Sequence, residues 1–173
     1  MVEGSEDGFR AWVAVRREPL RRSVYLMCGD WYLADDVVQD AMTRLYAVWD
    51  RVARRGDPEA YARRIVVNLL IDHNRRPARR EIPRETLPES AGPGSADDRR
   101  EVLASALAEV PPRQRATLVL RFWEGLSVEE TASIMNCSTG TVKSNTSKGL
   151  ANLRAILSHE RWEQLPATAR DRS

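Results

Sequence analysis

One face of the segment from residue 139 to residue 157 combines small hydroxyl side chains with lysines. At 100° per residue, Val142, Leu150 and Leu153 fall together on the other face, so an amphipathic helix is expected. Short polar side chains permit close approach to a DNA groove, and cations contact phosphates or guanine edges. The pattern favours a helix that reads duplex DNA. Its candidate contact residues are Thr139, Thr141, Lys143, Ser144, Ser147 and Lys148.

Start and stop signals before this helix predict a helix-turn-helix. Ser127 and Glu130 have the spacing of a capping box, Asn136-Cys137 is expected to form a short turn, and Ser138 can cap the second helix. A short helix, a tight turn and a longer helix are typical of proteins that place the second helix in the major groove. The alternative is an amphipathic pair whose polar face is only solvated. Three cations upstream are candidate contacts to the DNA backbone: Arg113, Arg115 and Arg121.

Charge is distributed in blocks along the 173-residue chain, although the formal net charge is only +2. Residues 30–50 hold five aspartates and one arginine, whereas residues 51–80 hold nine arginines and three acidic residues. Neighbouring blocks of opposite sign indicate two partners of opposite charge, and nucleic acid is a candidate for one of them.

Both blocks are expected to contain amphipathic helices. In the acidic block, Val37, Ala41 and Leu45 recur at helical spacing and form an apolar stripe. In the basic block, Asp57-Pro58-Glu59 is a strong helix start, and the helix is expected to end before Pro77. The side chains opposite the apolar stripe of the acidic block are Asp35, Asp36, Gln39 and Asp40. The polar stripe along the basic helix consists of Arg64, Asn68, Asp72 and Arg75.

The predicted fold is all-α, with two small helical domains joined by a flexible linker. No run of alternating residues is long enough to predict a strand. The first domain is expected at residues 1–76 and the second at 99–160, followed by a tail at 161–173. The linker is expected at 77–98, because this stretch holds four prolines and two glycines without periodicity. Within the first domain, Pro19 is expected to separate two helices.

Several function classes are excluded by what the sequence lacks. No apolar run approaches the ~20 residues of a membrane span, and the start (MVEGSEDGFR) lacks a signal-peptide core. We therefore expect no membrane partner and a cytoplasmic location. No phosphate loop, glycine-rich nucleotide fingerprint or nucleophile elbow occurs, and neither His73 nor His159 has a Cys or Glu at metal-ligand spacing. The sequence predicts no catalytic residue, metal site, cofactor or small-molecule substrate.

Two motifs, in this order, resemble one protein family. Residues 34–41 (ADDVVQDA) resemble the A-E-D-L-V-Q-E signature of the bacterial extracytoplasmic-function (group 4) sigma factors of RNA polymerase, with Val37 and Asp40 as mild departures. Residues 126–154 are similar to the helix-turn-helix of their second domain, and the segment V-K-S-N-T-S-K suggests a compact actinobacterial-type subgroup. The resemblance implies a sigma factor that directs core RNA polymerase to promoters and assists promoter melting.

The resemblance also assigns partners to the charge blocks. It implies that Asp35, Asp36, Gln39 and Asp40 dock on a coiled coil of the largest polymerase subunit. It implies that the basic helix and the loop at 50–57 hold the melted minus-ten element of promoter DNA, with a flipped base beside the loop. The second domain then binds the minus-thirty-five element as duplex, and an anti-sigma factor is a further candidate partner. The implied minus-ten contacts are Arg54, Arg55, Tyr61, Arg64, Asn68, Asp72, Arg75 and Arg76.

Two other functions fit parts of the sequence. One is a stand-alone helix-turn-helix transcriptional regulator whose N-terminal half senses a signal or dimerises. This function predicts tight duplex binding by the purified chain and symmetric half-sites. The other is a helical protein-interaction module, which predicts no salt-dependent affinity for DNA. A sigma factor is instead expected to bind DNA specifically only when core polymerase is present.

Overall fold

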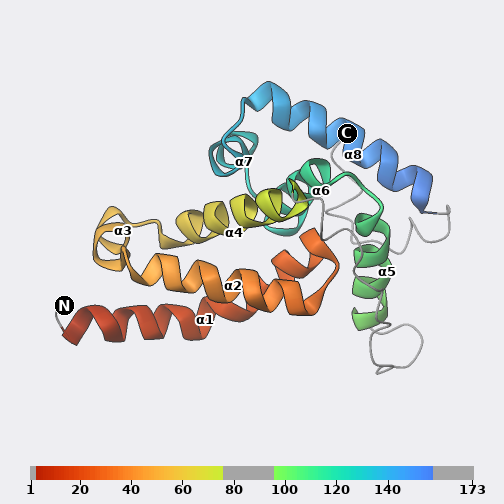
Figure 1. The fold of residues 1–173 in the computed structure, drawn as a ribbon. Coiled ribbons are helices and arrows are strands. Elements are labelled where there is room, and N and C mark those ends of the chain that lie inside the picture. The colour runs from red at the N-terminus through yellow and green to blue at the C-terminus, as the bar shows by residue number, and fades with distance from the viewer. Residues whose placement is uncertain (1–2, 76–95, 158–173) are drawn as a thin grey trace.

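Helices are the only regular elements in the part of the chain that the computed structural model describes, residues 3–75 and 96–157 (Figure 1). The all-α prediction is therefore confirmed. Most of the predicted linker and the whole predicted tail lie outside the described residues. Within these two stretches, no helix combines the length and the apolar content that crossing a lipid bilayer requires.

The first helix, α1 (Glu3–Cys28), passes through Pro19 without a break, so the predicted separation into two helices is wrong. Proline removes one backbone N–H, whose acceptor would be the carbonyl of Val15. Both residues are exposed, so water can hydrate that carbonyl. Leu20 and Val24 are buried in the core, and this packing outweighs the local cost of the proline.

A capped helix and a short helix follow α1. α2 (Trp31–Tyr46) begins after Asp30, whose carboxylate accepts hydrogen bonds from two backbone N–H groups of the first turn. α3 (Trp49–Arg55) occupies most of the stretch predicted as a loop at 50–57. It ends at Gly56, where φ is 82°, a left-handed conformation that glycine adopts without a Cβ clash. The arginines of this stretch are therefore presented by a helix rather than by a loop.

The fourth helix, α4 (Pro58–Arg75), begins where the sequence predicts. The Asp57 carboxylate accepts a hydrogen bond from the backbone N–H of Ala60 at 2.8 Å and caps the helix. α4 packs against α1 and α2, and Val38 and Val66 are almost completely buried among these helices. Figure 1 shows α1, α2 and α4 running side by side, with α3 at one end.

Between residues 96 and 157, the described part of the second unit contains four α-helices and one π-helical turn. Its elements are α5 (Ala96–Ala108), α6 (Pro112–Leu118), the π turn η2 (Val119–Trp123), α7 (Val128–Met135) and α8 (Thr139–Ile156). α5 begins inside the stretch predicted as linker. At η2 the backbone N–H of Glu124 donates to the carbonyl of Val119, five residues earlier, at 3.0 Å. The wider turn sets the direction of the side chains that follow it.

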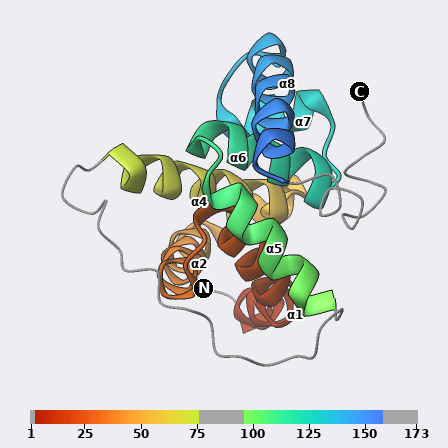
Figure 2. The same ribbon diagram turned by 90° about the vertical axis from the view of Figure 1, so that its right-hand side faces the viewer.

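The two units share one hydrophobic core. α5 lies across α1, as Figure 2 shows, and α7 packs against α4. Leu107 of α5 belongs to the same buried cluster as Val24 of α1 and Leu70 of α4. The two units, which the sequence divides at a linker, are therefore packed on each other in this structure.

Candidate polymerase and nucleic-acid interfaces

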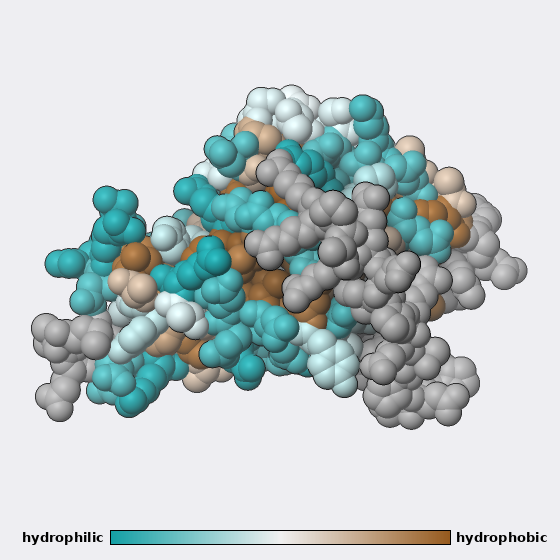
Figure 3. Space-filling view, viewed as in Figure 1, coloured by the Kyte–Doolittle hydropathy of each residue, from teal (hydrophilic) through white to brown (hydrophobic). Residues whose placement is uncertain are grey.

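α8 carries its predicted polar face open to solvent. Val142 and Leu153 are 0% and 4% exposed, so the apolar face is buried as its periodicity predicts. The opposite face contributes to the pale surface at the top of Figure 3. Its predicted contact residues are all exposed: Thr139, Thr141, Lys143, Ser144, Ser147 and Lys148. Hydroxyls and ammonium groups on an uncovered helix face can approach a DNA groove closely.

The N-terminal caps of α7 and α8 fix the turn that orients α8. The hydroxyl of Ser127 accepts from the N–H of Glu130 at 3.1 Å, and the Glu130 carboxylate accepts from the N–H of Ser127 at 2.7 Å. The predicted capping box is therefore confirmed. These hydrogen bonds hold the pKa of Glu130 below its usual value, because they favour the charged form. Between the helices, Asn136 takes a left-handed φ of 50°, and the Ser138 hydroxyl accepts from the N–H of Thr141 at 3.1 Å.

Gly149 lets α8 cross α6 at close range. A Cβ at this position would lie 3.1 Å from Cγ and Cδ1 of Leu118 and 3.3 Å from Cβ of Gln114. One turn further along α8, the Asn152 amide donates to the Gln114 side chain at 2.8 Å. A glycine inside a helix costs about 1 kcal/mol relative to alanine. The glycine lies at the point where α8 packs on α6, so the close packing of these two helices accounts for its presence.

The three upstream arginines do not form a common surface. Arg113 is exposed, as a phosphate contact requires. Arg115 is buried, and its guanidinium donates to the carbonyls of Met27, Ala108 and Val110 at 2.9–3.3 Å. These carbonyls lie at the end of α1, at the end of α5 and two residues after α5, so Arg115 joins the two units and is unavailable to DNA in this structure. Burial also lowers the pKa of Arg115.

Arg121 is engaged locally. Its guanidinium donates to the carbonyl of Leu126 and lies 6.0 Å from the centre of the Phe122 ring. The burial of Arg115 contradicts its predicted contact with the DNA backbone, whereas Arg121 is only partly buried and its predicted contact stays a prediction. Sequence alone could not show which carbonyls would lie within their reach.

The polar stripe of α4 is present, and part of it contacts α7. Arg64, Asn68 and Asp72 are exposed, but the Arg64 guanidinium donates to the hydroxyl of Ser133 at 3.0 Å. Tyr61 is partly buried. The side chains of Arg75 and Arg76 lie outside the described residues. Arg54 and Arg55 are exposed at the end of α3, where Arg54 Nε donates to the Asp50 carbonyl at 2.8 Å.

The acidic face of α2 divides into engaged and uncovered carboxylates. Asp35 accepts two hydrogen bonds from Arg21, at 2.6 Å and 3.0 Å, and this pairing lowers the pKa of Asp35. Arg21 also lies 4.3 Å from the centre of the Trp31 ring. Asp35 therefore ties α2 to α1, a role that the sequence did not indicate.

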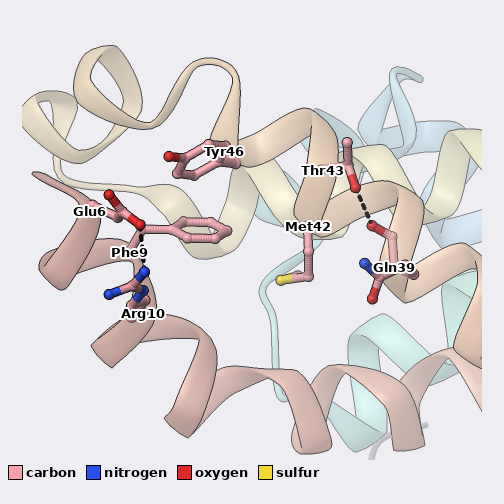
Figure 4. Close-up of a pocket in the computed structure, with 7 residues that line it drawn as sticks. All are labelled: Glu6, Phe9, Arg10, Gln39, Met42, Thr43 and Tyr46. Carbon is pink, nitrogen blue, oxygen red and sulfur yellow. Dashed lines mark hydrogen bonds and ion pairs between the residues drawn. The ribbon is translucent and has the colours of Figure 1, made fainter. Parts of the chain in front are cut away.

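Asp36, Gln39 and Asp40 make up the rest of that face. Asp36 and Gln39 are exposed, and Asp40 pairs with Arg44, one turn later on the same helix. A groove of about 310 Å³ between α1 and α2 adjoins Gln39. In Figure 4 the rings of Phe9 and Tyr46 lie together at the other end of this groove. The surface around the acidic face is thus partly apolar, as a protein-docking surface often is.

A partly buried ion pair lies between the two units. Arg63 donates to the Glu124 carboxylate at 2.6 Å and 3.0 Å, and the Ser23 hydroxyl donates to the same carboxylate. The side chains of Arg63 and Glu124 are only 15% and 13% exposed. Sequence reasoning missed Glu124, because it lies outside the amphipathic stripes and its partners are distant in the chain.

The fold and these surfaces define a helical DNA-binding protein with a C-terminal helix-turn-helix. Family models described as Sigma-70 region 2 and Sigma-70, region 4 match residues 12–80 and 100–153. The chain is 36% identical to an RNA polymerase sigma-E factor of Streptomyces avermitilis, over 91% of this chain and 89% of that protein. It is 30% identical to the ECF RNA polymerase sigma factor EcfG of Rhodopseudomonas palustris, over 87% of this chain and 86% of that protein.

The chain therefore belongs to the extracytoplasmic-function sigma factors of RNA polymerase, which direct the core enzyme to promoters. The family prediction is confirmed, and the stand-alone regulator is not favoured. The fold agrees with that of the sigma factor RpoE in a co-crystal structure with the anti-sigma factor NepR from Bartonella quintana. That match has a TM-score of 0.71 at 24% identity and covers 86% of this chain and 96% of that one.

Proposed function

We propose that this sigma factor divides its work among three helices: α2 docks on core polymerase, α4 holds separated promoter strands, and α8 reads duplex DNA. The observation that carries the proposal is the exposed face of α8, where six hydroxyl or lysine side chains lie opposite a buried apolar face. A groove-reading helix needs this combination, and a capped helix-turn-helix supports it.

The docking role of α2 rests on two carboxylates that face away from α1. Asp36 is exposed, and Asp40 is partly exposed and paired with Arg44 on the same helix. Acidic side chains that face a basic helical coiled coil contribute orientation and association rate more than affinity. Asp35 contributes indirectly, since its pair with Arg21 fixes α2 on α1.

The strand-holding role of α4 rests on its stripe of polar side chains. Arg64 and Asn68 are one turn apart on the exposed side of the helix, and Asp72 continues the stripe. A guanidinium can follow a phosphate backbone, and a carboxamide can bond the edge of an unpaired base. Arg54 and Arg55, exposed in the last turn of α3, are further proposed contacts to the separated strands.

The chain itself performs no chemical step in this proposal, because bond formation belongs to the polymerase. Its place of action is the cytoplasm, where core polymerase works. An anti-sigma factor is a further proposed partner, since the sigma factor RpoE of similar fold was crystallised with NepR.

A reconstitution with core polymerase tests the proposal. Transcription from duplex and pre-melted promoter libraries is expected only when the chain is added. The double variant Asp36→Arg, Asp40→Arg should lose polymerase capture by at least ~10-fold while circular dichroism stays unchanged. Glu129→Arg is the matched control, because this exposed acid lies on α7, in the other unit. Full capture by the double variant would contradict the docking role.

A further inference from the structure

Tyr32 is the most exposed large hydrophobic residue in the parts of the chain that the structure describes, at 77%. It is the second residue of α2, and its backbone N–H donates to the Asp30 carboxylate at 2.8 Å. The N-terminal cap therefore holds the backbone of Tyr32 in place while its ring remains in solvent. Tyrosine is among the residues that most often carry binding energy at protein interfaces, so the neighbours of this ring decide what it can bind.

The neighbours of Tyr32 belong to the face of α2 that we propose docks on polymerase. At about 100° per residue, Asp36 lies about 40° and Gln39 about 20° from Tyr32 around the helix axis. All three residues are exposed. Tyr32 and Asp36 are one turn apart, and Cβ atoms in a helix tilt toward the N-terminus, so the Asp36 side chain extends toward the turn that carries Tyr32. The ring therefore continues the acidic face by one turn.

The preceding residues of α2 show what an aromatic ring and a carboxylate at this spacing can bind. Trp31 and Asp35 are likewise four residues apart on α2. The Arg21 guanidinium of α1 lies 4.3 Å from the centre of the Trp31 ring, and it donates to the Asp35 carboxylate at 2.6 Å and 3.0 Å. One guanidinium is thus held by the face of the ring and by two hydrogen bonds to the carboxylate at the same time.

Tyr32 and Asp36 repeat this pair one residue further along the helix. The shift of one residue rotates the second pair by about 100°, away from the Arg21 of α1 that the first pair binds. Over residues 3–75 and 96–157, no cation contacts the Tyr32 ring or pairs with the Asp36 carboxylate. The first pair therefore fastens α2 to α1, whereas the second pair is accessible to a side chain of another protein.

We propose that Tyr32 and Asp36 together bind one arginine of core polymerase, with the guanidinium stacked on the ring and paired with the carboxylate. The inference rests on the proposed docking role of α2. A cation is expected because residues 30–50 hold five aspartates against one arginine. Arginine suits this pair better than lysine, because its planar guanidinium stacks on an aromatic face and donates two parallel hydrogen bonds to a carboxylate. Tyr32 is then a specificity-determining residue of the docking surface.

A series of substitutions at Tyr32, measured as the Kd of the full chain for core polymerase, tests the inference. Tyr32→Ala should raise the Kd at least ~5-fold, because the ring that stacks on the guanidinium is lost. Tyr32→Phe keeps the ring and should stay within about 2-fold of the parent. Tyr32→Leu keeps apolar bulk without a π face and should bind nearly as weakly as Tyr32→Ala. Val15→Ala is the matched control, since Val15 is 66% exposed on α1.

A double-mutant cycle across the interface identifies the bound arginine. Each arginine on the coiled coil of the largest polymerase subunit is changed to glutamine in turn, and each polymerase is titrated with the parent chain and with Tyr32→Ala. One of these changes should weaken binding of the parent and leave Tyr32→Ala with almost no further effect, because both substitutions remove the same contact. If Tyr32→Ala has the same effect with every polymerase variant, none of these arginines binds the ring and the inference is wrong.

Failure of this inference differs from failure of the proposed function. Parent-like binding by Tyr32→Ala or Tyr32→Leu, while Asp36→Arg, Asp40→Arg still loses capture, would overturn arginine binding by the ring and leave α2 as the docking helix. Full capture by that double variant would contradict the docking role itself. Unfolding of each variant is followed by circular dichroism, and a Tyr32→Ala chain that is destabilised as well as weakly bound would overturn the inference, because the ring would then act through the fold.

Discussion

α4 and α8 are helices of the same length, 18 residues each, and both expose a polar stripe opposite a buried apolar face. They differ in their neighbours. The stripe of α8 faces solvent, whereas that of α4 includes Arg64, which bonds to Ser133 of the other unit. Amphipathic pattern therefore specifies which side of a helix is polar, but packing between units decides whether that side is available.

The largest expected effect is at Arg115. The sequence predicts this cation to contact DNA, but in the structure it links the two units. Arg115→Met removes the donor to two buried carbonyls, those of Met27 and Val110, and to the partly buried carbonyl of Ala108, and we expect a loss of about 2–4 kcal/mol in the free energy of unfolding. Denaturant titration measures this. Arg113→Met, at an exposed position two residues earlier, should change stability by less than about 0.5 kcal/mol. Equal effects of the two changes would refute the structural role of Arg115.

A second prediction separates α8 from α4 by the DNA each binds. Lys143→Ala and Lys148→Ala should each reduce holoenzyme binding to a duplex minus-thirty-five element, and the salt slope should fall by about 1 for each phosphate that the protein no longer neutralises. Arg64→Gln should leave duplex binding intact and weaken binding to a pre-melted minus-ten fragment. Binding measured against salt concentration checks both. Loss of duplex binding by Arg64→Gln alone would reverse the assignment.

Gly149→Ala tests how α8 is seated. Its Cβ would press on Leu118 and Gln114, and overpacking costs about 1–3 kcal/mol against a helix-propensity gain of about 1. We expect a net loss of about 1 kcal/mol in thermal or chemical unfolding. Gly140→Ala is the control, because only the Ser138 hydroxyl lies near, at 3.7 Å. A stabilised Gly149→Ala would show that α8 can shift on α6 at no cost.

The smallest expected effect concerns pH. Arg21 lowers the pKa of Asp35 from its ordinary value of 3.8, so folding favours the ionised form. The contribution of the Arg21–Asp35 pair to the free energy of unfolding is present above pH 3.8 and is lost as pH falls through the lower pKa that Asp35 has in the folded state. Asp35→Asn should thus cost under about 1 kcal/mol near neutrality, since the pair is partly exposed, and almost nothing in strong acid. Unfolding curves across pH measure this, with Asp36→Asn as control. A difference in stability between the parent and Asp35→Asn that grows as pH falls would contradict this dependence on the ionised carboxylate.

Local signals carried most of what the sequence could predict. The capping box at Ser127, the helix start at Asp57 and the face of α8 all depend on residues within a few turns of one another, and all appear in the structure. The roles of Asp35 and Arg115 could not be predicted. Asp35 meets a partner 14 residues away on another helix, and Arg115 meets a carbonyl 88 residues away. Such pairings depend on how helices cross, which periodicity does not encode.

The π turn at Val119–Trp123 has a consequence for insertions and deletions. One residue fewer would restore ordinary helical spacing and swing every following side chain by about 100° around the axis. Glu124 would then point away from Arg63, although no ionisable group had been removed. The number of residues in this turn therefore determines whether Glu124 and Arg63 can pair between the two units.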